Sequence, residues 1–403
     1  AMRIDADGNK VAHEFHRALM KSAASLNYEE VQAAVDGAPN DKVAPLLDKV
    51  IRPLYAAYAA LKKARAVRQP LELDLPERQI VLDDDGKVSA VNFKDRLDAH
   101  RLIEEFMVLA NVAAAETLIE KKASLLFRVH EEPSPEKLDA LREVANASGL
   151  QLAKGQVLQT AHLNRLLAQA RDTEHAEQVN ISTLRSMTQA YYNPENFGHF
   201  GLALKAYAHF TSPIRRYADL IVHRALVASH GWGKDGLSPW DVEHLANTAK
   251  KISDTERRSM VAERDTTDRY LASFLSERMD VEMPGRISGI AKFGVFVKLD
   301  ETGADALVPI RTLGTEYFDF DAESQTLMGS NSGIMIGLGQ PVVVKLSEAT
   351  PLTGGLTAEL ITLNDRAMPQ GQSRGRGKPP RRKVGSSKKK AAKTARKVKR
   401  TRR

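Results

Sequence analysis

The stretch Tyr207–Tyr217, YAHFTSPIRRY, carries the densest set of structural signals in this chain. Ser followed by Pro is typical of a helix start, so we expect a helix from Ser212 to about Ser229. The start of a helix leaves backbone N–H groups unpaired and carries a positive dipole. Arg215 and Arg216 would add guanidinium forks that suit phosphate. The stretch therefore predicts a phosphate-binding helix start; the alternative is a capped helix whose arginines pair with neighbouring acids.

Helical patterns continue on both sides of this stretch. Apolar residues at helical spacing predict a helix over 41–68, bent at Pro53. The segment 99–122 is apolar nearly all round, which is typical of a buried helix. We also expect helices over 134–149, 181–192 and 238–278, a strand-like connector over 198–202, a hairpin over 79–91 and a strand running into a turn at the start of the chain.

The pattern changes at Asp280, where short β-rich runs separated by glycines and turn residues replace the helices. Several such strands within about 85 residues are typical of a small barrel. The chain is therefore expected to be α+β, with a helix-rich part followed by a five-stranded barrel. The expected strands cover 285–290, 294–299, 306–310, 341–346 and 355–361.

The end of the chain is strongly basic. Ser373–Arg403 holds sixteen Lys or Arg and no Asp or Glu, while the rest of the chain carries 43 basic and 51 acidic residues. Neutralising the phosphates of a polyanion releases counterions, so this tail predicts an RNA or DNA partner. The alternative is a solvated tail without a partner. Its composition cannot bury a core, and we expect it to be disordered when free.

Composition also excludes several classes of protein. The chain has no cysteine, so disulfide frameworks and thiolate metal sites are impossible. No apolar run reaches the roughly 18 residues that span a bilayer, and no signal-peptide pattern opens the chain. We therefore expect a cytoplasmic protein without a membrane partner.

Two pairs of polar residues are candidates for chemistry. Asp219 and His223 lie one helical turn apart, as a metal or proton-relay pair could, although a structural histidine is the simpler alternative. Glu104 and Asn111 share a face of the apolar helix over 99–122. A buried carboxylate is costly unless it is paired or used, which favours a role for Glu104. An ion pair with Arg101 is the alternative.

The expected barrel has a candidate nucleic-acid face of its own. Lys292, Phe293 and Phe296 lie together around a glycine that would allow a tight curve. Exposed aromatic rings can stack on bases, so we expect at least one of the two rings to do so. The alternative is that one ring is core and the other is incidental.

Seven stretches follow one another along the chain in an order typical of one family. They are Arg17–Ala24, Leu26–Gln32, Leu102–Asn111, Leu184–Met187, Gly198–Leu202, Tyr207–Tyr217 and Ala262–Asp265. Together they resemble the ribonuclease II (RNB) family of processive 3′→5′ exoribonucleases, and the resemblance covers essentially Met2 to Ile361. It implies a catalytic domain over 1–278, an OB-fold RNA-binding barrel of the ribosomal S1 type over 279–364, and a Lys/Arg-rich tail over 365–403.

The resemblance also implies roles for individual residues. Arg215 would contact the scissile phosphate and stabilise the transition state, and Arg216 beside it would bind RNA. Tyr28 would stack on the terminal base, and Glu104 would accept hydrogen bonds from the terminal ribose. Glu263 falls where the family has a glutamate near the exit of the catalytic cavity.

The chain departs from the family pattern in two places. Leu73 stands near the position of the family's second stacking aromatic, and Pro309 stands where related barrels often carry a histidine. The family threads single-stranded RNA into a narrow channel, and water activated by Mg²⁺ releases nucleoside 5′-monophosphates.

The family's Mg²⁺-binding aspartates and two cold-shock-like domains are expected upstream of residue 1, with no metal ligand inside this chain. We therefore expect a fragment that is inactive alone. A non-catalytic RNA-binding or regulatory protein derived from an RNB remnant is the alternative, and the coding sequence upstream would discriminate between the two. A DNA-compacting basic protein would need only the tail. Structured or single-stranded RNA is the expected partner, and the tail could also contact ribosomes.

Overall fold

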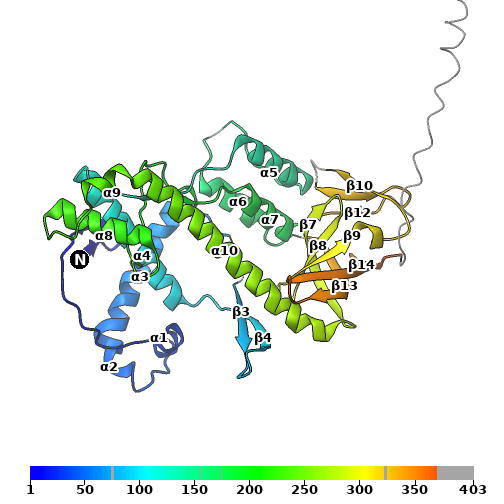
Figure 1. The fold of residues 1–403 in the computed structure, drawn as a ribbon, viewed down its shortest axis with the longest axis horizontal. Helices are drawn as coiled ribbons and strands as arrows, with labels where there is room; N and C mark the ends of the chain where they lie inside the picture. Colours follow the sequence, from blue (N-terminus) through cyan, green and yellow to red (C-terminus); the bar gives the residue numbers. More distant parts are fainter. Residues whose placement is uncertain (74–76, 156, 174, 322–324, 370–403) are drawn as a thin grey trace, which may run out of the picture.

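The computed structural model describes residues 1–73, 77–155, 157–173, 175–321 and 325–369. Within these residues it combines a helical part with a strand-rich part, as expected for an α+β chain (Figure 1). The basic tail expected from Ser373 lies outside the described residues. None of the described helices is long and apolar enough to cross a bilayer.

The first elements confirm the expected strand and bent helix. Strands β1 (Met2–Ile4) and β2 (Lys10–His13) form an antiparallel pair. After α1 (Tyr28–Val35) and the short α2 (Ala44–Leu46), a π-helical turn leads into α3 (Arg52–Arg68). The irregular turn immediately precedes Pro53, which lies in the first turn of α3, where proline is tolerated.

Helix α4 (Asp98–Glu120) is the buried helix that the sequence predicts, with Leu102, Val108 and Leu118 at most 6% exposed. The hairpin is also confirmed, as β3 (Arg78–Leu82) and β4 (Val88–Phe93). Ile80 and Val91 of this hairpin pack against the core of the strand-rich part. The hairpin therefore joins the two parts of the molecule.

Helices α5 (Pro135–Ala147), α6 (Thr160–Ala170) and α7 (Ala176–Ser186) share one core. Ser134 caps α5 as expected, since its hydroxyl accepts the N–H of Lys137. The expected helix over 181–192 is wrong beyond Ser186. There the chain forms β6 (Tyr191–Asn193), paired with β5 (Phe127–Val129), because β5 and Ser253 satisfy its backbone. The connector after it is a 3₁₀ turn at Phe200–Leu202 rather than a strand.

Helix α8 (Tyr217–His230) begins several residues later than the Ser-Pro pair predicts. The segment before it is a turn, in which the N–H of Arg216 donates to the carbonyl of Ser212 at 3.1 Å. The last helices, α9 (Pro239–Glu243) and α10 (Leu245–Leu275), are separated only by His244. Together with a 3₁₀ turn ending at Arg278, they occupy the expected long helix.

The five expected strands are present as β7 (Glu282–Ala291), β8 (Gly294–Leu299), β9 (Asp305–Pro309), β13 (Pro341–Thr350) and β14 (Gly355–Leu363). Their pairings close, because β13 pairs with both β7 and β14 while β9 meets β14 in parallel. A small sheet of β10 (Phe318–Asp321), β11 (Thr326–Gly329) and β12 (Met335–Ile336) was not predicted. Strand β15 (Arg366–Ala367) and the buried Met368 continue this part beyond the boundary expected at 364.

Helix α10 connects the two parts (Figure 1). At its start, Leu245 and Ala249 pack in the same core as Ala218 and Ile221 of α8. At its end, Leu271 and Leu275 are buried in the core of the strand-rich part. A single rigid element of 31 residues therefore runs from the region of α8 to the strands.

Candidate functional site

The turn before α8 separates the two arginines of the quoted stretch. The carboxylate of Asp219 is fully buried and accepts the N–H of Ser212 at 2.7 Å and Nη2 of Arg216 at 2.8 Å. Nε of Arg216 lies 2.8 Å from the other carboxylate oxygen. These contacts hold the segment as a turn and delay the helix to Tyr217. Arg216 is thus an internal ion-pair partner, and its expected role in RNA binding stays a prediction.

Arg215 is exposed beside this buried pair. Its Nε donates to Oγ of Ser212 at 3.1 Å, which fixes the root of the side chain. No carboxylate of the described residues forms an ion pair with it. Because α8 begins two residues later, Arg215 lies beside a helix start with its own positive dipole. The structure therefore presents one available guanidinium where the sequence suggested two.

Asn111 of α4 holds the strand-like segment that leads into this turn. Its side chain is 1% exposed. Its Oδ1 accepts the N–H of Phe210 at 2.8 Å and that of Thr211 at 3.2 Å, and its Nδ2 donates to the hydroxyl of Tyr207 at 2.8 Å. One amide thus satisfies two backbone groups and one phenol, which fixes the Arg215 turn against α4.

His223 has a structural role in the same region. Its ring stacks on that of Phe210, with centroids 4.3 Å apart and planes 13° apart, and its Nε2 lies 2.9 Å from the carbonyl oxygen of Phe210. Asp219, one turn earlier, is committed to Arg216. The interpretation of Asp219 and His223 as a metal or relay pair is therefore wrong, because each side chain has its own structural partner.

A layer of buried histidines and tyrosines lies under the turn, and sequence reasoning missed it. Burial lowers the pKa of His209 to about 2 and that of His199 to about 3. Burial likewise raises the pKa of Tyr192 to about 12, and its hydroxyl lies 2.9 Å from Nδ1 of His209. Both imidazoles are neutral at neutral pH. The clustering of His and Tyr between 191 and 209 was the available sequence signal.

Glu104 lines a cavity of about 810 Å³ beside α4, together with Leu73 and Asn180. Five Lys or Arg side chains and three carboxylates line this cavity. Glu104 forms an ion pair there with Arg96, so the alternative of an ion pair with Arg101 is wrong. The cavity thus combines cations and carboxylates with apolar side chains, so it offers both charged and apolar contacts to a small ligand.

The buried carboxylate of α4 is Glu105 rather than Glu104. Glu105 is 5% exposed, with Nη1 of Arg65 at 2.6 Å and Nη2 of Arg68 at 3.3 Å. The inference that a buried Glu104 must be used was wrong, because helical periodicity could not show which of two adjacent glutamates faces inward. Glu104 remains a candidate because it lines the cavity.

Tyr28 lies at the start of α1 and is 40% exposed. Its ring stacks on His100, with centroids 4.1 Å apart. His100, Glu104 and Asn111 follow one another along α4 over a rise of about 16 Å. Helix α4 therefore connects Tyr28, the cavity and the Arg215 turn, although neither Tyr28 nor Arg215 lines the cavity itself.

The remaining predicted residues lie elsewhere. Glu263 is exposed on α10, at a hollow of about 570 Å³ that it shares with Arg78 of β3. In the strand-rich part Lys292 is exposed, and Phe293 is 58% exposed and packs edge-to-face on Phe296 at 6.0 Å. Phe296 is half-buried, so Phe293 is the ring available to a ligand.

The expected tight curve lies at Gly294, between Phe293 and Phe296. A Cβ atom at Gly294 would come within 2.3 Å of the carbonyl oxygen of Val308 on β9. Only glycine allows this approach of the two strands. The turn that presents Phe293 is thus fixed by backbone packing.

The described residues do not fit a magnesium site. They contain no group of three or more His, Asp or Glu that could hold a metal ion. The carboxylates at the Arg215 turn and the cavity each form an ion pair with an arginine; they are Asp219, Glu72, Glu104 and Glu105. Asp5 accepts hydrogen bonds within its own turn, from Asp7 and Asn9.

The model of the RNB domain matches residues 1–230. The chain therefore belongs to the RNB family. It is 36% identical to ribonuclease R of Escherichia coli over 355 residues, which are 86% of this chain and 44% of that protein. It is 34% identical to ribonuclease R of Aquifex aeolicus over 345 residues, 85% of this chain and 49% of that one. The chain thus spans about half the length of these relatives.

Solved structures give the same result. The apo form of Mycoplasma genitalium RNase R matches with a TM-score of 0.83 and 27% identity, over 89% of this chain and 57% of that one. The same protein in complex with ribose-methylated single-stranded RNA matches equally well. Its complex with double-stranded RNA matches with a TM-score of 0.74 and 25% identity, over 89% and 59% of the two chains.

Proposed function

We propose that this chain is part of a processive 3′→5′ exoribonuclease that hydrolyses RNA to nucleoside 5′-monophosphates in RNA decay and quality control. The observation that carries the proposal is Arg215, an exposed guanidinium without a carboxylate partner among the described residues. Membership of the RNB family and the RNA complexes of the M. genitalium relative support RNA as the ligand. Arg215 would contact the scissile phosphate and stabilise the charge that develops there.

The other predicted residues are assigned to the same strand of RNA. Glu104, in its cavity, would bind the terminal ribose, and Tyr28 would stack near the terminal base. Glu263 would lie near the exit for the product. Leu73 lines the cavity but has no aromatic face, so the stacking on that side would be weaker than an aromatic pair gives.

We also propose a division of the chain by function. Residues 1–278 would belong to the catalytic domain and 279–364 to an OB-fold RNA-binding domain of the ribosomal S1 type, with Lys292, Phe293 and Phe296 on its RNA face. The closed pairing of β7, β8, β9, β14 and β13 supports the barrel. In the range 365–403, β15 and Met368 pack with the barrel, and the basic segment Ser373–Arg403 would bind RNA or ribosomes in a salt-dependent way.

Mg²⁺ is the metal that we propose for the intact enzyme, with ligands outside the described residues. The commitment of Asp219, Glu104 and Glu105 to arginines supports this. Hydrolysis with two metal ions needs several carboxylates converging on ions about 4 Å apart. The chain alone is therefore proposed to bind RNA but to release few or no mononucleotides.

Two measurements on the purified chain test these proposals. With Mg²⁺ and a 3′-labelled RNA, we expect no appreciable release of mononucleotides, and appreciable release would contradict the proposed inactivity. In a binding assay with the same RNA, we expect wild-type binding, weaker binding by Arg215→Ala, and partial recovery in Arg215→Lys. Unchanged affinity in Arg215→Ala would contradict the role of this side chain.

The second candidate is a non-catalytic RNA-binding or regulatory protein derived from an RNB remnant. The absence of a fitting metal cluster in the described part of the chain favours it. It predicts that RNA binding persists in Arg215→Ala, because the barrel and the tail would carry the affinity. The binding assay above therefore separates the two candidates.

A further inference from the structure

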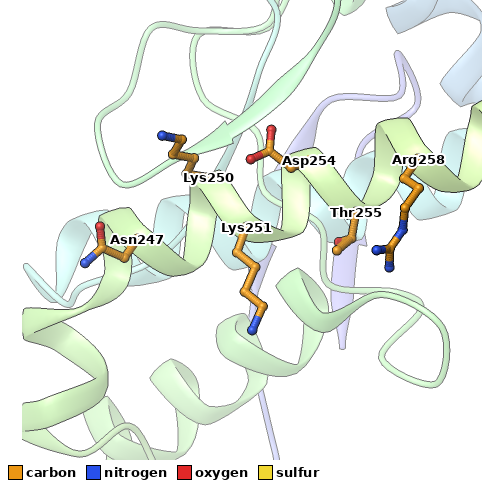
Figure 2. Close-up of a pocket in the computed structure, with 6 residues that line it drawn as sticks. All are labelled: Asn247, Lys250, Lys251, Asp254, Thr255 and Arg258. Atoms are coloured by element: carbon orange, nitrogen blue, oxygen red, sulfur yellow. The ribbon is translucent and has the colours of Figure 1, made fainter.

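One exposed face of α10 carries cations that the proposed active site does not use. Asn247, Lys251, Thr255 and Arg258 follow one another at intervals of three or four residues, so they lie on one side of the helix. Together with Lys250 and Asp254 they line a shallow hollow of about 350 Å³. Figure 2 shows Lys251, Thr255 and Arg258 projecting from the same side of α10. We call Asn247, Lys251, Thr255 and Arg258 the α10 stripe.

The cations at this face have no internal partners. Within the described part of the chain, Lys250, Lys251 and Arg258 form no ion pair and no hydrogen bond through their side chains. The nearby acids are neutralised by other residues, because Asp254 pairs with Arg257 and Glu256 pairs with Arg128. The face therefore has a net positive charge, unlike Arg216 or Arg128, whose charges are compensated inside the protein.

The spacing of the stripe suits a partner with repeated negative charges. From Asn247 to Arg258 the helix rises about 16 Å, and Lys251 and Arg258 are about 10 Å apart along its axis. A phosphate backbone can contact both cations at once, with a different phosphate at each. The side chains between them, Asn247 and Thr255, are neutral hydrogen-bonding groups of the kind that contact phosphate and sugar.

The composition of the stripe disfavours a protein partner. It contains no tryptophan or tyrosine, and Arg258 is its one residue of a type that often anchors protein–protein interfaces. An acidic protein surface would meet only solvated cations here, which contribute little. The favoured partner is therefore a nucleic-acid backbone.

The stripe lies on the side of α10 that faces away from the core shared with α8. In this part of the helix Leu245, Ala249 and Ser253 are buried, and Ala249 packs in one core with Ala218 of α8. These residues are two positions from members of the stripe, which places them on the opposite side of the helix. From there α10 runs to the strand-rich part that carries Phe293. The stripe is therefore a surface separate from the Arg215 turn, on the helix that leads to the strand-rich part.

We propose that the α10 stripe binds the sugar–phosphate backbone of RNA, as a contact surface separate from the Arg215 turn. This inference rests on the proposed function, because it takes RNA as the ligand. It assigns the stripe a sequence-independent electrostatic role, which contributes to affinity and to its dependence on salt.

The test compares two double variants of the full chain that remove the same charge. Lys251→Ala/Arg258→Ala changes the stripe, and Lys121→Ala/Lys122→Ala changes two exposed cations at the end of α4. Binding of a fluorescein-labelled 16-nucleotide RNA is followed by anisotropy between 0.05 and 0.4 M KCl. Each lost phosphate contact lowers the slope of log affinity against log salt by about 0.7–0.9. The stripe variant should therefore lose about 1.5 from this slope and roughly tenfold in affinity at 0.1 M salt.

The control variant Lys121→Ala/Lys122→Ala should keep the salt slope and the RNA affinity of the wild type within experimental error. Lys251→Arg/Arg258→Lys should also behave as wild type, because the charge is kept. A stripe variant with the slope of the control pair would overturn the proposal and leave an acidic protein as the partner of this face. That failure is distinguishable from failure of the proposed function, which would appear as absent RNA binding in the wild type or as no effect of Arg215→Ala.

Discussion

Replacing Asn111 with leucine should destabilise the fold strongly, although the two side chains have the same number of heavy atoms and the same branching. The amide oxygen accepts two backbone N–H groups, from Phe210 and Thr211, and its NH₂ donates to Tyr207. Asn111 is 1% exposed, so water cannot replace these partners. Three lost hydrogen bonds contribute about 1 kcal/mol each, and each orphaned buried N–H adds a desolvation cost. With about 3 kcal/mol for the three bonds and about 1 kcal/mol for each of the two orphaned N–H groups, we expect a loss of about 5 kcal/mol in the free energy of unfolding.

The assay is urea unfolding followed by circular dichroism, with Tyr207→Phe as the matched control. The control removes one hydrogen bond of the same network and keeps both backbone contacts, so it should cost only about 1 kcal/mol. Asn111→Leu should also weaken RNA binding, because it releases the segment that positions Arg215. If the two variants have equal stabilities, Asn111 does not anchor the turn and this reasoning is refuted.

Three further predictions concern the same regions. Arg216→Ala should lower the free energy of unfolding in urea by about 3–5 kcal/mol, because it leaves the buried carboxylate of Asp219 unpaired. Arg215→Ala should lower it by less than about 0.5 kcal/mol. Equal losses would contradict the different roles of the two arginines. The folded-state pKa values of His199 and His209 lie below the ordinary 6.5, so the stability they contribute is complete above that pH and is lost as pH falls below it. Unfolding measured at pH 7 and pH 5 should show a loss of about 4 kcal/mol from the two groups, and His209→Gln should roughly halve this difference; a difference that His209→Gln leaves unchanged would show that the group does not titrate this way. Phe293→Ala should leave the unfolding curve nearly unchanged but reduce RNA affinity by about 1–3 kcal/mol, measured by anisotropy, and an unchanged affinity would exclude base stacking at this ring.

Local patterns predicted elements whose signals lie within their own sequence. Ser134 and Pro135 marked the start of α5 because the cap and the fixed proline angle act on adjacent residues. The short strands after Asp280 were found because glycines and turn residues bound each of them. The Ser-Pro pair at Ser212 did not predict the helix start correctly. The carboxylate of Asp219 accepts the N–H of Ser212, and the helix begins only at Tyr217.

Motif order also predicted the family, because several stretches in sequence carry it together. Single residues were predicted less well. Whether Glu104 or Glu105 points inward depends on where Arg65 and Arg68 of α3 meet α4, and that contact joins segments almost 40 residues apart. Tyr191 and Tyr192 form a strand because β5, more than 60 residues earlier, offers them hydrogen bonds.

The sequence by itself determined most of the helices, the five strands that form the closed sheet and the family, because these depend on short-range periodicity, caps and contiguous motifs. Only the tertiary structure decided which charges remain available. Arg215 and Arg216 are adjacent and chemically identical, yet the buried Asp219 compensates one and leaves the other exposed. The cations on α10 are likewise available only because the neighbouring acids pair with other side chains. Sequence spacing alone does not show which acid a given cation meets, because the fold of the turn and the burial of Asp219 set the directions of the side chains.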